Sequence, residues 1–250
     1  MISGITIITI CMNSAATIED TLRSVIEQTY SGKLEYIIVD GGSTDGTLDV
    51  IEKYRQYIAS VVSEPDDGIS DAFNKGIGMV TGGPIGIINS DDTLLPGVLK
   101  KVTDYFAANP DVQVVHGDLE LYDGNRFVKI LKPPRFWWIP WRMILFNHPT
   151  AFVRREVYEK CGLFDTSYSY SMDFELFLRW IKSGIVIHYL PETLVRMRAG
   201  GASGRYVYKG FRENLRALKA YGYPILPAYL QFFSKHMVQG LLDIMNFIRE

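Results

Sequence analysis

The sequence predicts an α/β protein with a doubly wound, mostly parallel central sheet and helices on both faces. Within the first 110 residues, short apolar runs typical of strands alternate with segments of helical periodicity. These runs are continuously apolar rather than alternating, which indicates strands buried on both faces. Two of them lead directly into acidic residues, as expected at the edge of an open α/β sheet where ligands bind.

The order of elements changes near residue 110. Before it, we expect strands at 5–10, 36–39, 60–63 and 84–88, and helices near 18–26, 48–54, 69–80 and 96–108. After it, we expect shorter strands at 112–115, 119–122 and 127–131, and helices near 170–183 and 206–221. We therefore predict one continuous domain over residues 1–205 and a C-terminal helical extension over 206–250.

Composition narrows the function. The chain has 250 residues, of which 47% are hydrophobic and 22% charged, an ordinary balance for a globular protein with a sizeable core. The net charge of -2 gives no basic face, so we expect no nucleic-acid partner. The N-terminus lacks the features of a signal peptide, and no apolar stretch reaches the roughly 18–20 residues that span a bilayer. We therefore expect a cytoplasmic protein.

The strand at 36–39 ends in Asp40, followed by two glycines that allow a sharp turn. An acid at the end of a buried strand, without a cationic neighbour in sequence, indicates contact with a ligand. Thr44 and Asp45, a few residues later, are more simply explained as caps of the next helix.

Asp91 and Asp92 follow the strand at 84–88 and should lie at the same sheet edge as Asp40. Two adjacent acids repel each other unless a cation or hydrogen-bond donors compensate. Their hard oxygens suit Mg²⁺ or Mn²⁺, which typically bridges carboxylates to substrate phosphates. A solvated turn is the alternative explanation for this pair alone.

Several segments together resemble family 2 glycosyltransferases of the GT-A fold. The resemblance spans roughly residues 3–205 and is carried, in the family's order, by 7–13, 28–30, 39–47, 64–76 and 89–92. It implies a nucleotide-sugar half at about 1–110 and an acceptor half at about 111–205. The implied reaction is transfer of a sugar from a nucleotide-sugar, often a UDP-sugar, to a hydroxyl of a glycan or lipid-linked glycan. Inversion at the anomeric carbon and a role in cell-surface polysaccharide synthesis are also implied.

The resemblance also implies roles for individual residues. Asp40 corresponds to the acid that contacts the nucleotide base, Asp91 to the acid that meets the ribose, and Asp92 to the ligand of a divalent metal. Asn89 replaces the first acid of the family's Asp-x-Asp pattern, which leaves the division of roles between Asp91 and Asp92 open. The remaining residues assigned to the nucleotide-sugar site are Asp67, Asn74, Lys75 and Arg198, although a surface lysine explains Lys75 equally simply.

The catalytic base should come from the second half. Asp173 falls at or before the first turn of the helix at 170–183, where capping is the structural alternative. The resemblance assigns Asp173 to the base that takes the proton from the acceptor hydroxyl, with Glu175 as a second candidate. His148 is compatible with the acceptor pocket or with a buried core histidine. Trp138, in the aromatic run 136–141, could stack on a sugar, pack on the core or meet a membrane interface.

Residues 226–248 carry an apolar stripe at helical spacing, typical of core packing, of a homo-oligomer contact or, with weaker support, of peripheral membrane contact. Two other functions compete with the glycosyltransferase. A nucleotidyltransferase would normally show a glycine-rich basic phosphate loop after the first strand, which residues 11–15 lack. A catalytically inactive sugar-nucleotide-binding subunit would not need all four acids, Asp40, Asp91, Asp92 and Asp173.

Overall fold

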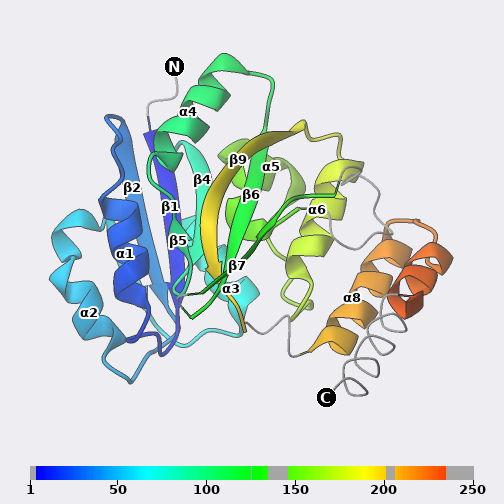
Figure 1. The fold of residues 1–250 in the computed structure, drawn as a ribbon, viewed down its shortest axis with the longest axis horizontal. Coiled ribbons are helices and arrows are strands. Elements are labelled where there is room, and N and C mark those ends of the chain that lie inside the picture. Colours follow the sequence, from blue (N-terminus) through cyan, green and yellow to red (C-terminus); the bar gives the residue numbers. More distant parts are fainter. Residues whose placement is uncertain (1–3, 125, 135–145, 201–205, 235–250) are drawn as a thin grey trace.

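The computed structural model describes residues 4–124, 126–134, 146–200 and 206–234. These residues form a nine-stranded sheet with the order β3-β2-β1-β4-β8-β6-β9-β5, and β7 pairs with β6 (Figure 1). The strands are β1 (Gly4–Cys11), β2 (Lys33–Asp40), β3 (Ser60–Ser63), β4 (Pro84–Asn89), β5 (Thr93–Leu94), β6 (Val114–Asp123), β7 (Arg126–Leu131), β8 (Phe152–Arg154) and β9 (Ile187–Arg198).

Most of the sheet runs in one direction. Strands β1, β2, β3 and β4 are mutually parallel. Strand β8 is antiparallel to both β4 and β6, so β6 runs with β4, and β9 is parallel to β6. Only the short strands β5, β7 and β8 oppose this direction among the described residues. The mostly parallel sheet predicted from the apolar runs is confirmed.

Helices cover both faces of the sheet (Figure 1). Helices α1 (Ile18–Ile26), α2 (Thr47–Lys53) and α4 (Val98–Ala108) pack on one face, and α3 (Ile69–Gly78), α5 (Arg155–Cys161) and α6 (Met172–Lys182) on the other. Helix α8 (Val207–Ala220) packs against α6, and residues 226–234 form a further helical segment. Two 3-10 turns, η1 (Arg55–Tyr57) and η3 (His148–Thr150), complete the described elements.

The two-residue period of the strands divides the core into two clusters. Ile7 of β1 and Ile38 of β2 contribute to the cluster under α1 and α4, while Ile8 and Ile37 contribute to the cluster under α3 and α6. All four side chains are at most 1% exposed. A strand buried on both faces must be apolar at consecutive positions, which explains the continuous runs in the sequence.

The second half of the sheet differs from the sequence prediction. The expected strands at 112–115 and 119–122 form one strand, β6, with register shifts near Gly117 where it pairs with β9. A Cβ atom on Gly117 would lie 2.6 Å from the carbonyl oxygen of Glu192. The glycine therefore permits a close approach of β9 rather than ending the strand. Strands β8 and β9 and helix α5 were not predicted.

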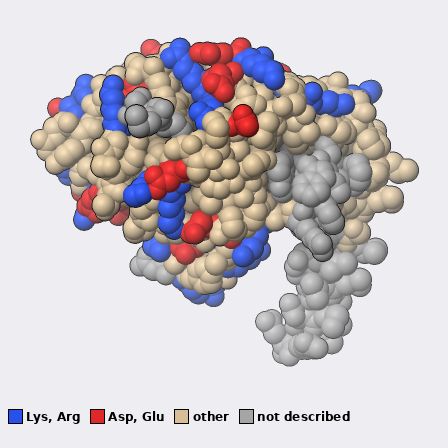
Figure 2. All heavy atoms as spheres, turned by 90° about the horizontal axis from the view of Figure 1, so that it is seen from above, with Lys and Arg blue, Asp and Glu red and all other residues tan. Residues whose placement is uncertain are grey.

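The described part of the predicted C-terminal extension is α8 and the helical segment 226–234, and the boundary at residue 205 stays a prediction. Trp138 and the apolar stripe beyond residue 234 lie outside the described residues. Within the described residues, no helix combines the length and the apolar character needed to cross a membrane. Figure 2 shows acidic and basic side chains interspersed on the face seen from above in Figure 1.

Candidate active site

A cavity of about 880 Å³ lies at the carboxyl ends of β1 and β4. The end of β1 contributes Cys11 and Met12, and the end of β4 contributes the segment 89–92. The rest of the lining comes from α3, η3, the start of α6, α8 and the helical segment 226–234. Of the residues predicted from the sequence, the cavity brings together five: Asp91, Asp92, His148, Asp173 and Arg198.

Asp92 is the most deeply buried acid of this cavity, with 1% of its surface exposed. Its carboxylate accepts hydrogen bonds from the Asn89 side-chain amide at 3.2 Å and from the Arg198 N–H at 3.4 Å. Burial and the neighbouring charge of Asp91 raise the pKa of Asp92 to about 7, despite these two donors. Two adjacent carboxyls with so little compensation have the chemistry of a cation site.

Asn89, which replaces the first acid of the family pattern, has a definite role. It supplies a hydrogen-bond donor to Asp92 where a second carboxylate would add repulsion. Arg198 ends β9 on the other side of Asp92, and its guanidinium lies 4.0 Å from Asp20 with 43% of the side chain exposed. Within the described chain, no group of three or more His, Cys, Asp and Glu side chains could hold a metal ion.

Asp40 does not line the cavity. It is fully buried, and its carboxylate accepts from the N–H groups of Gly42 and Ser43 at 3.1 and 3.0 Å and from the Ser43 and Ser63 hydroxyls at 2.5 and 2.7 Å. Burial alone would raise the pKa of Asp40, but the Ser43 and Ser63 donors hold it below its ordinary value. The structure thus shows Asp40 fixing the turn after β2, and its assignment to the nucleotide base stays a prediction.

Asp45 directly precedes Gly46, the N-cap residue of α2, and its contacts are structural. Its carboxylate accepts from the N–H and hydroxyl of Thr47, where α2 begins, at 3.0 and 2.5 Å. It also accepts from the Ala15 N–H at 3.0 Å, which joins the loop after β1 to the loop after β2.

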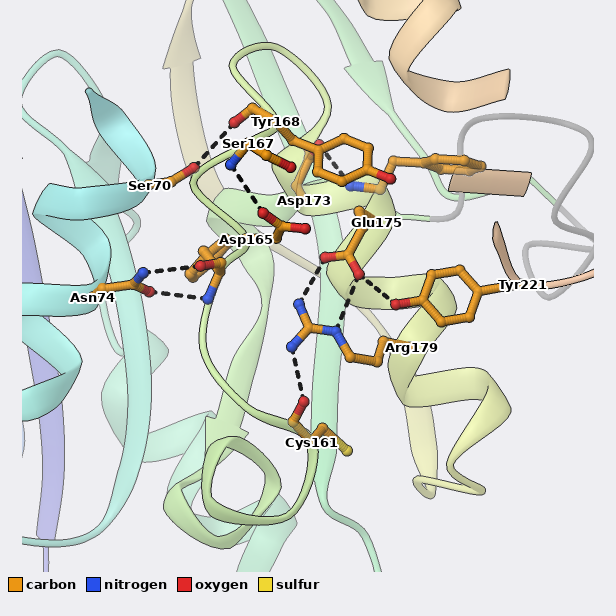
Figure 3. Close-up of polar contacts among 12 residues, drawn as sticks. Ser70, Asn74, Cys161, Asp165, Ser167, Tyr168, Asp173, Glu175, Arg179 and Tyr221 are labelled. Atoms are coloured by element: carbon orange, nitrogen blue, oxygen red, sulfur yellow. Dashed lines mark hydrogen bonds and ion pairs between the residues drawn. The ribbon is translucent and has the colours of Figure 1, made fainter. Parts of the chain in front are cut away.

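Besides Asp40, three residues predicted for the nucleotide-sugar site lie outside the cavity lining, namely Asp67, Asn74 and Lys75. The Asn74 amide exchanges two hydrogen bonds of 2.9 Å with the backbone of Phe164 and so fastens α3 to the segment after α5 (Figure 3). Lys75 pairs with Glu64 at 2.9 Å and Asp71 at 3.1 Å. Asp66 and Gly68, on either side of Asp67, line the cavity instead.

Asp173 lies in the first turn of α6 and lines the cavity. Its carboxylate accepts the N–H of Phe174 at 2.7 Å, as expected for an acid near a helix N-terminus. Burial raises the pKa of Asp173 above its ordinary value. A carboxylate with a raised pKa binds a proton more readily, which is the property a general base needs.

Glu175 is engaged elsewhere. It is 3% exposed, forms an ion pair with Arg179 at 2.6 Å and accepts the Tyr221 hydroxyl (Figure 3). Arg179 also donates to the Cys161 carbonyl at 2.8 Å. Glu175 therefore joins α6 to the ends of α5 and α8, and Asp173 is the carboxylate of α6 that faces the cavity.

Helix α8 holds the residues directly before Asp173. The Glu213 carboxylate accepts the N–H groups of Ser169, Tyr170 and Ser171 at 3.1, 2.8 and 2.9 Å. The Ser171 hydroxyl donates to the Gly210 carbonyl at 3.0 Å. Glu213 was not predicted from the sequence, because its partners lie 42–44 positions away and leave no local pattern.

His148 lines the cavity within a cluster of aromatic side chains. Its ring centroid lies 5.1 Å from that of Phe73 and 5.6 Å from that of Phe164. Burial lowers its pKa to about 4, so the ring is neutral near pH 7. His148 therefore fits both explanations offered for it. It lines the cavity, as an acceptor-side residue would, and it packs among aromatic side chains, as a buried core histidine would.

The comparisons with known proteins identify the family. The model described as Glycosyl transferase family 2 matches residues 6–172. The chain belongs to this family. It is thus a glycosyltransferase, and the predicted GT-A fold is confirmed.

Several relatives match most of this chain, among them the following two. The PGL/p-HBAD biosynthesis glycosyltransferase of Mycobacterium bovis is 26% identical over 217 residues, covering 82% of this chain and 80% of that protein. An uncharacterized glycosyltransferase of Haemophilus influenzae is 27% identical over 221 residues, covering 82% and 68%.

Solved structures share the fold. S. aureus TarS 1–349 in complex with UDP-GlcNAc has a TM-score of 0.70 at 17% identity, covering 86% of this chain and 66% of that one. The same TarS fragment without a named ligand is matched over 65% of its length, so this chain spans just under two thirds of it. The mannosyltransferase PcManGT from Pyrobaculum calidifontis, in complex with GDP-Man and Mn²⁺, has a TM-score of 0.66 at 22% identity, covering 90% and 68%.

Proposed function

We propose that this enzyme transfers a sugar from a UDP-sugar to a hydroxyl of a glycan or lipid-linked glycan, with inversion at the anomeric carbon. The observation that carries the proposal is that Asp91, Asp92 and Asp173 line one cavity. The acids after β4 lie on the side of the nucleotide-sugar half, and Asp173 lies on the side of the acceptor half. A single displacement needs these two groups of residues on opposite sides of the sugar.

On the donor side, Asp91 and Asp92 are the residues that would hold Mg²⁺ or Mn²⁺ together with the diphosphate. The raised pKa of Asp92, which reflects burial beside Asp91, fits a site that a cation completes. When the metal is bound, it supplies positive charge to the diphosphate that leaves. Arg198 donates its backbone N–H to Asp92 and lines the same cavity, so its guanidinium supplies a second positive charge that suits these phosphates.

On the acceptor side, Asp173 takes the proton from the attacking hydroxyl. The hydroxyl oxygen then forms the new bond to the anomeric carbon while the bond to the diphosphate breaks. The pKa of Asp173, raised by burial, increases its capacity to hold that proton. Hydrogen bonds from the residues before Asp173 to Glu213 keep the start of α6 in place.

The other assigned residues complete the donor site in this proposal. Asp40 recognises the nucleotide base, and Asp67, Asn74 and Lys75 belong to the segment that closes over the nucleotide and sugar. Trp138 and His148 contribute to the acceptor side. The UDP-GlcNAc and GDP-Man complexes of the structural neighbours support a nucleotide-sugar donor, and the choice of uridine follows from the family resemblance.

We further propose that the protein acts in the cytoplasm, in cell-surface polysaccharide synthesis, with peripheral contact at the inner face of the membrane. The C-terminal helical segment is the candidate for this contact or for a homo-oligomer. Its side chains Leu226 and Leu230 are 67% and 64% exposed, which supports an apolar contact surface. The M. bovis relative's name, which places it in PGL/p-HBAD biosynthesis, is compatible with a lipid-linked acceptor.

The experiment is a calorimetric and hydrolysis screen of UDP-, GDP- and dTDP-sugars, each with Mn²⁺ and with excess chelator. We expect metal-dependent binding and slow hydrolysis of a UDP-sugar, both lost in Asp92→Ala. Full activity with chelator would contradict the metal assignment. Pyrophosphate release from a nucleoside triphosphate and a sugar phosphate would instead favour a nucleotidyltransferase, and tight UDP binding without any turnover would favour an inactive binding subunit.

A further inference from the structure

We propose that the acceptor is an amphiphile whose hydrocarbon chain packs in the apolar end of the cavity. This apolar end is formed by Val207 and Phe211 of α8 and by Phe232 of the helical segment 226–234. The inference rests on the proposed function, since it places the hydroxyl of the same molecule at Asp173. It goes beyond that function by assigning a binding site for the non-sugar part of the acceptor.

The apolar end begins directly beside the candidate base. The Ser171 hydroxyl, two positions before Asp173, donates to the Gly210 carbonyl of α8 at 3.0 Å. The rings of Tyr170 and Tyr206, at the start of α8, lie 4.9 Å apart. Val207 and Phe211 flank Gly210 on α8, so a molecule that places its hydroxyl at Asp173 meets these apolar side chains next.

Three of the cavity-lining side chains at this end are apolar, namely Val207, Phe211 and Phe232, and Asn214 and Gln231 of the same two helices also line the cavity. Phe211 and Phe232 stack with their ring centroids 3.8 Å apart and are each 8% exposed. Val207, in contrast, is 41% exposed while lining the cavity. Contact with an alkyl chain would remove the exposed apolar surface of Val207 from water, which is energetically favourable. Contact with a hydrated sugar would not provide this gain in free energy.

The apolar surface continues from the cavity to the outside. Tyr208 and Phe233, whose rings lie 5.7 and 5.9 Å from that of Phe232, are 68% and 62% exposed. Leu230 on the same helical segment is 64% exposed. A chain that leaves the cavity past Phe232 therefore stays in contact with apolar side chains, which a purely hydrophilic glycan would not use.

The test compares acceptors that differ only in chain length. Methyl and octyl glycosides of glucose, galactose and mannose are offered with the best UDP-sugar and Mn²⁺, and both transfer and donor hydrolysis are measured. Each buried CH₂ group contributes about fourfold in affinity. Burial of two or more groups predicts a KM at least about tenfold lower for an octyl glycoside than for its methyl counterpart, with little change in kcat.

A variant pair locates the site. Val207→Ser should reduce the octyl preference roughly fourfold, the contribution of about one buried CH₂ group, without changing KM for the UDP-sugar. Val186→Ser is the matched control, because Val186 is 39% exposed and lies outside the cavity lining. The control should retain the full octyl preference.

The outcomes separate this inference from the proposed function. Donor hydrolysis with equal KM values for methyl and octyl acceptors would overturn the apolar site and leave the glycosyltransferase proposal standing. An octyl preference that survives Val207→Ser unchanged would overturn the placement of the hydrocarbon chain against α8. Absence of both hydrolysis and transfer with every donor would overturn the proposed function, and the inference with it.

Discussion

Glu213 binds the three backbone N–H groups directly before the helix that carries Asp173, although it lies outside the cavity lining. Replacing it with glutamine should therefore slow transfer without weakening donor binding. The change keeps the shape of the side chain and removes its charge. The acids Asp91 and Asp92 follow β4, and the Asp92 carboxylate accepts hydrogen bonds from Asn89 and Arg198 rather than contacting Glu213.

The magnitude follows from the hydrogen bonds that change. A bond to a charged group contributes about 1.5–3 kcal/mol, against about 0.5–1.5 kcal/mol for a neutral one. In Glu213→Gln, one oxygen remains as an acceptor, while the other becomes an NH₂ group that faces N–H donors. Because the Glu213 site is only half-buried, we expect a loss of roughly 1–3 kcal/mol in the free energy of unfolding.

The assay combines unfolding and kinetics. Urea denaturation gives the change in stability, and steady-state transfer gives kcat and KM for the UDP-sugar. A start of α6 displaced by even about 1 Å can cost on the order of 100-fold in rate, so we expect kcat to fall by about tenfold or more. KM for the donor should stay within about twofold. Glu52→Gln, an exposed glutamate on α2, serves as the control.

Two results would refute this reasoning. If Glu213→Gln retained wild-type kcat while losing stability, the contact would support the fold without positioning the base. If KM for the donor rose as much as kcat fell, the effect would have spread to the donor side, and Glu213 would not act through α6.

Three further predictions concern the fold and the donor side. The pKa of Asp92 is raised to about 7 in the folded protein. At about 1.4 kcal/mol per pKa unit, ionised Asp92 lowers the free energy of unfolding of the metal-free protein by at most roughly 4 kcal/mol at pH 8. Stability measured in chelator should therefore fall as the pH rises from about 4 through 7. In urea titrations, Asp92→Asn should flatten this decline, and the variant should lose metal-dependent donor binding. If the variant showed the same decline as the wild type, Asp92 would not be its source. Asn74→Ala should lower stability by roughly 1–3 kcal/mol, through loss of its two hydrogen bonds to Phe164, and an unchanged free energy of unfolding in urea titrations would contradict this fastening role. Gly117→Ala should destabilise by about 1–3 kcal/mol because its Cβ atom would meet the Glu192 carbonyl, and a neutral effect in thermal unfolding would contradict the close approach of β9.

The first half of the fold and the core of the site were predictable because their signals are local. A buried strand followed by acids, as at Asp91 and Asp92, places those acids at the sheet edge regardless of the rest of the chain. Asp173 was predictable from its family motif and its place at a helix start. In these cases a few adjacent residues determine the local structure that brings the acids to the cavity.

The remaining contacts depend on partners far away in sequence. Asn74 lies in the predicted segment but binds Phe164, 90 residues later, so its role as a fastener of α3 has no local signature. Gly117 looks like a strand break until β9 is placed beside it. Glu213 is one charged residue on an ordinary amphipathic helix until α8 packs against α6. The roles of these three residues depend on tertiary packing, which the periodicity of the sequence does not indicate.

The measurement that tests the central claim most directly is the effect of Asp173→Asn on transfer and donor binding. Asparagine keeps the size of the side chain and cannot take the acceptor proton. If Asp173 is the base in a cavity shared with Asp91 and Asp92, transfer should fall by about 100-fold or more, as expected for loss of a general base. Calorimetric binding of the UDP-sugar with Mn²⁺ should be unchanged. Transfer at the wild-type rate by the folded variant would contradict the account.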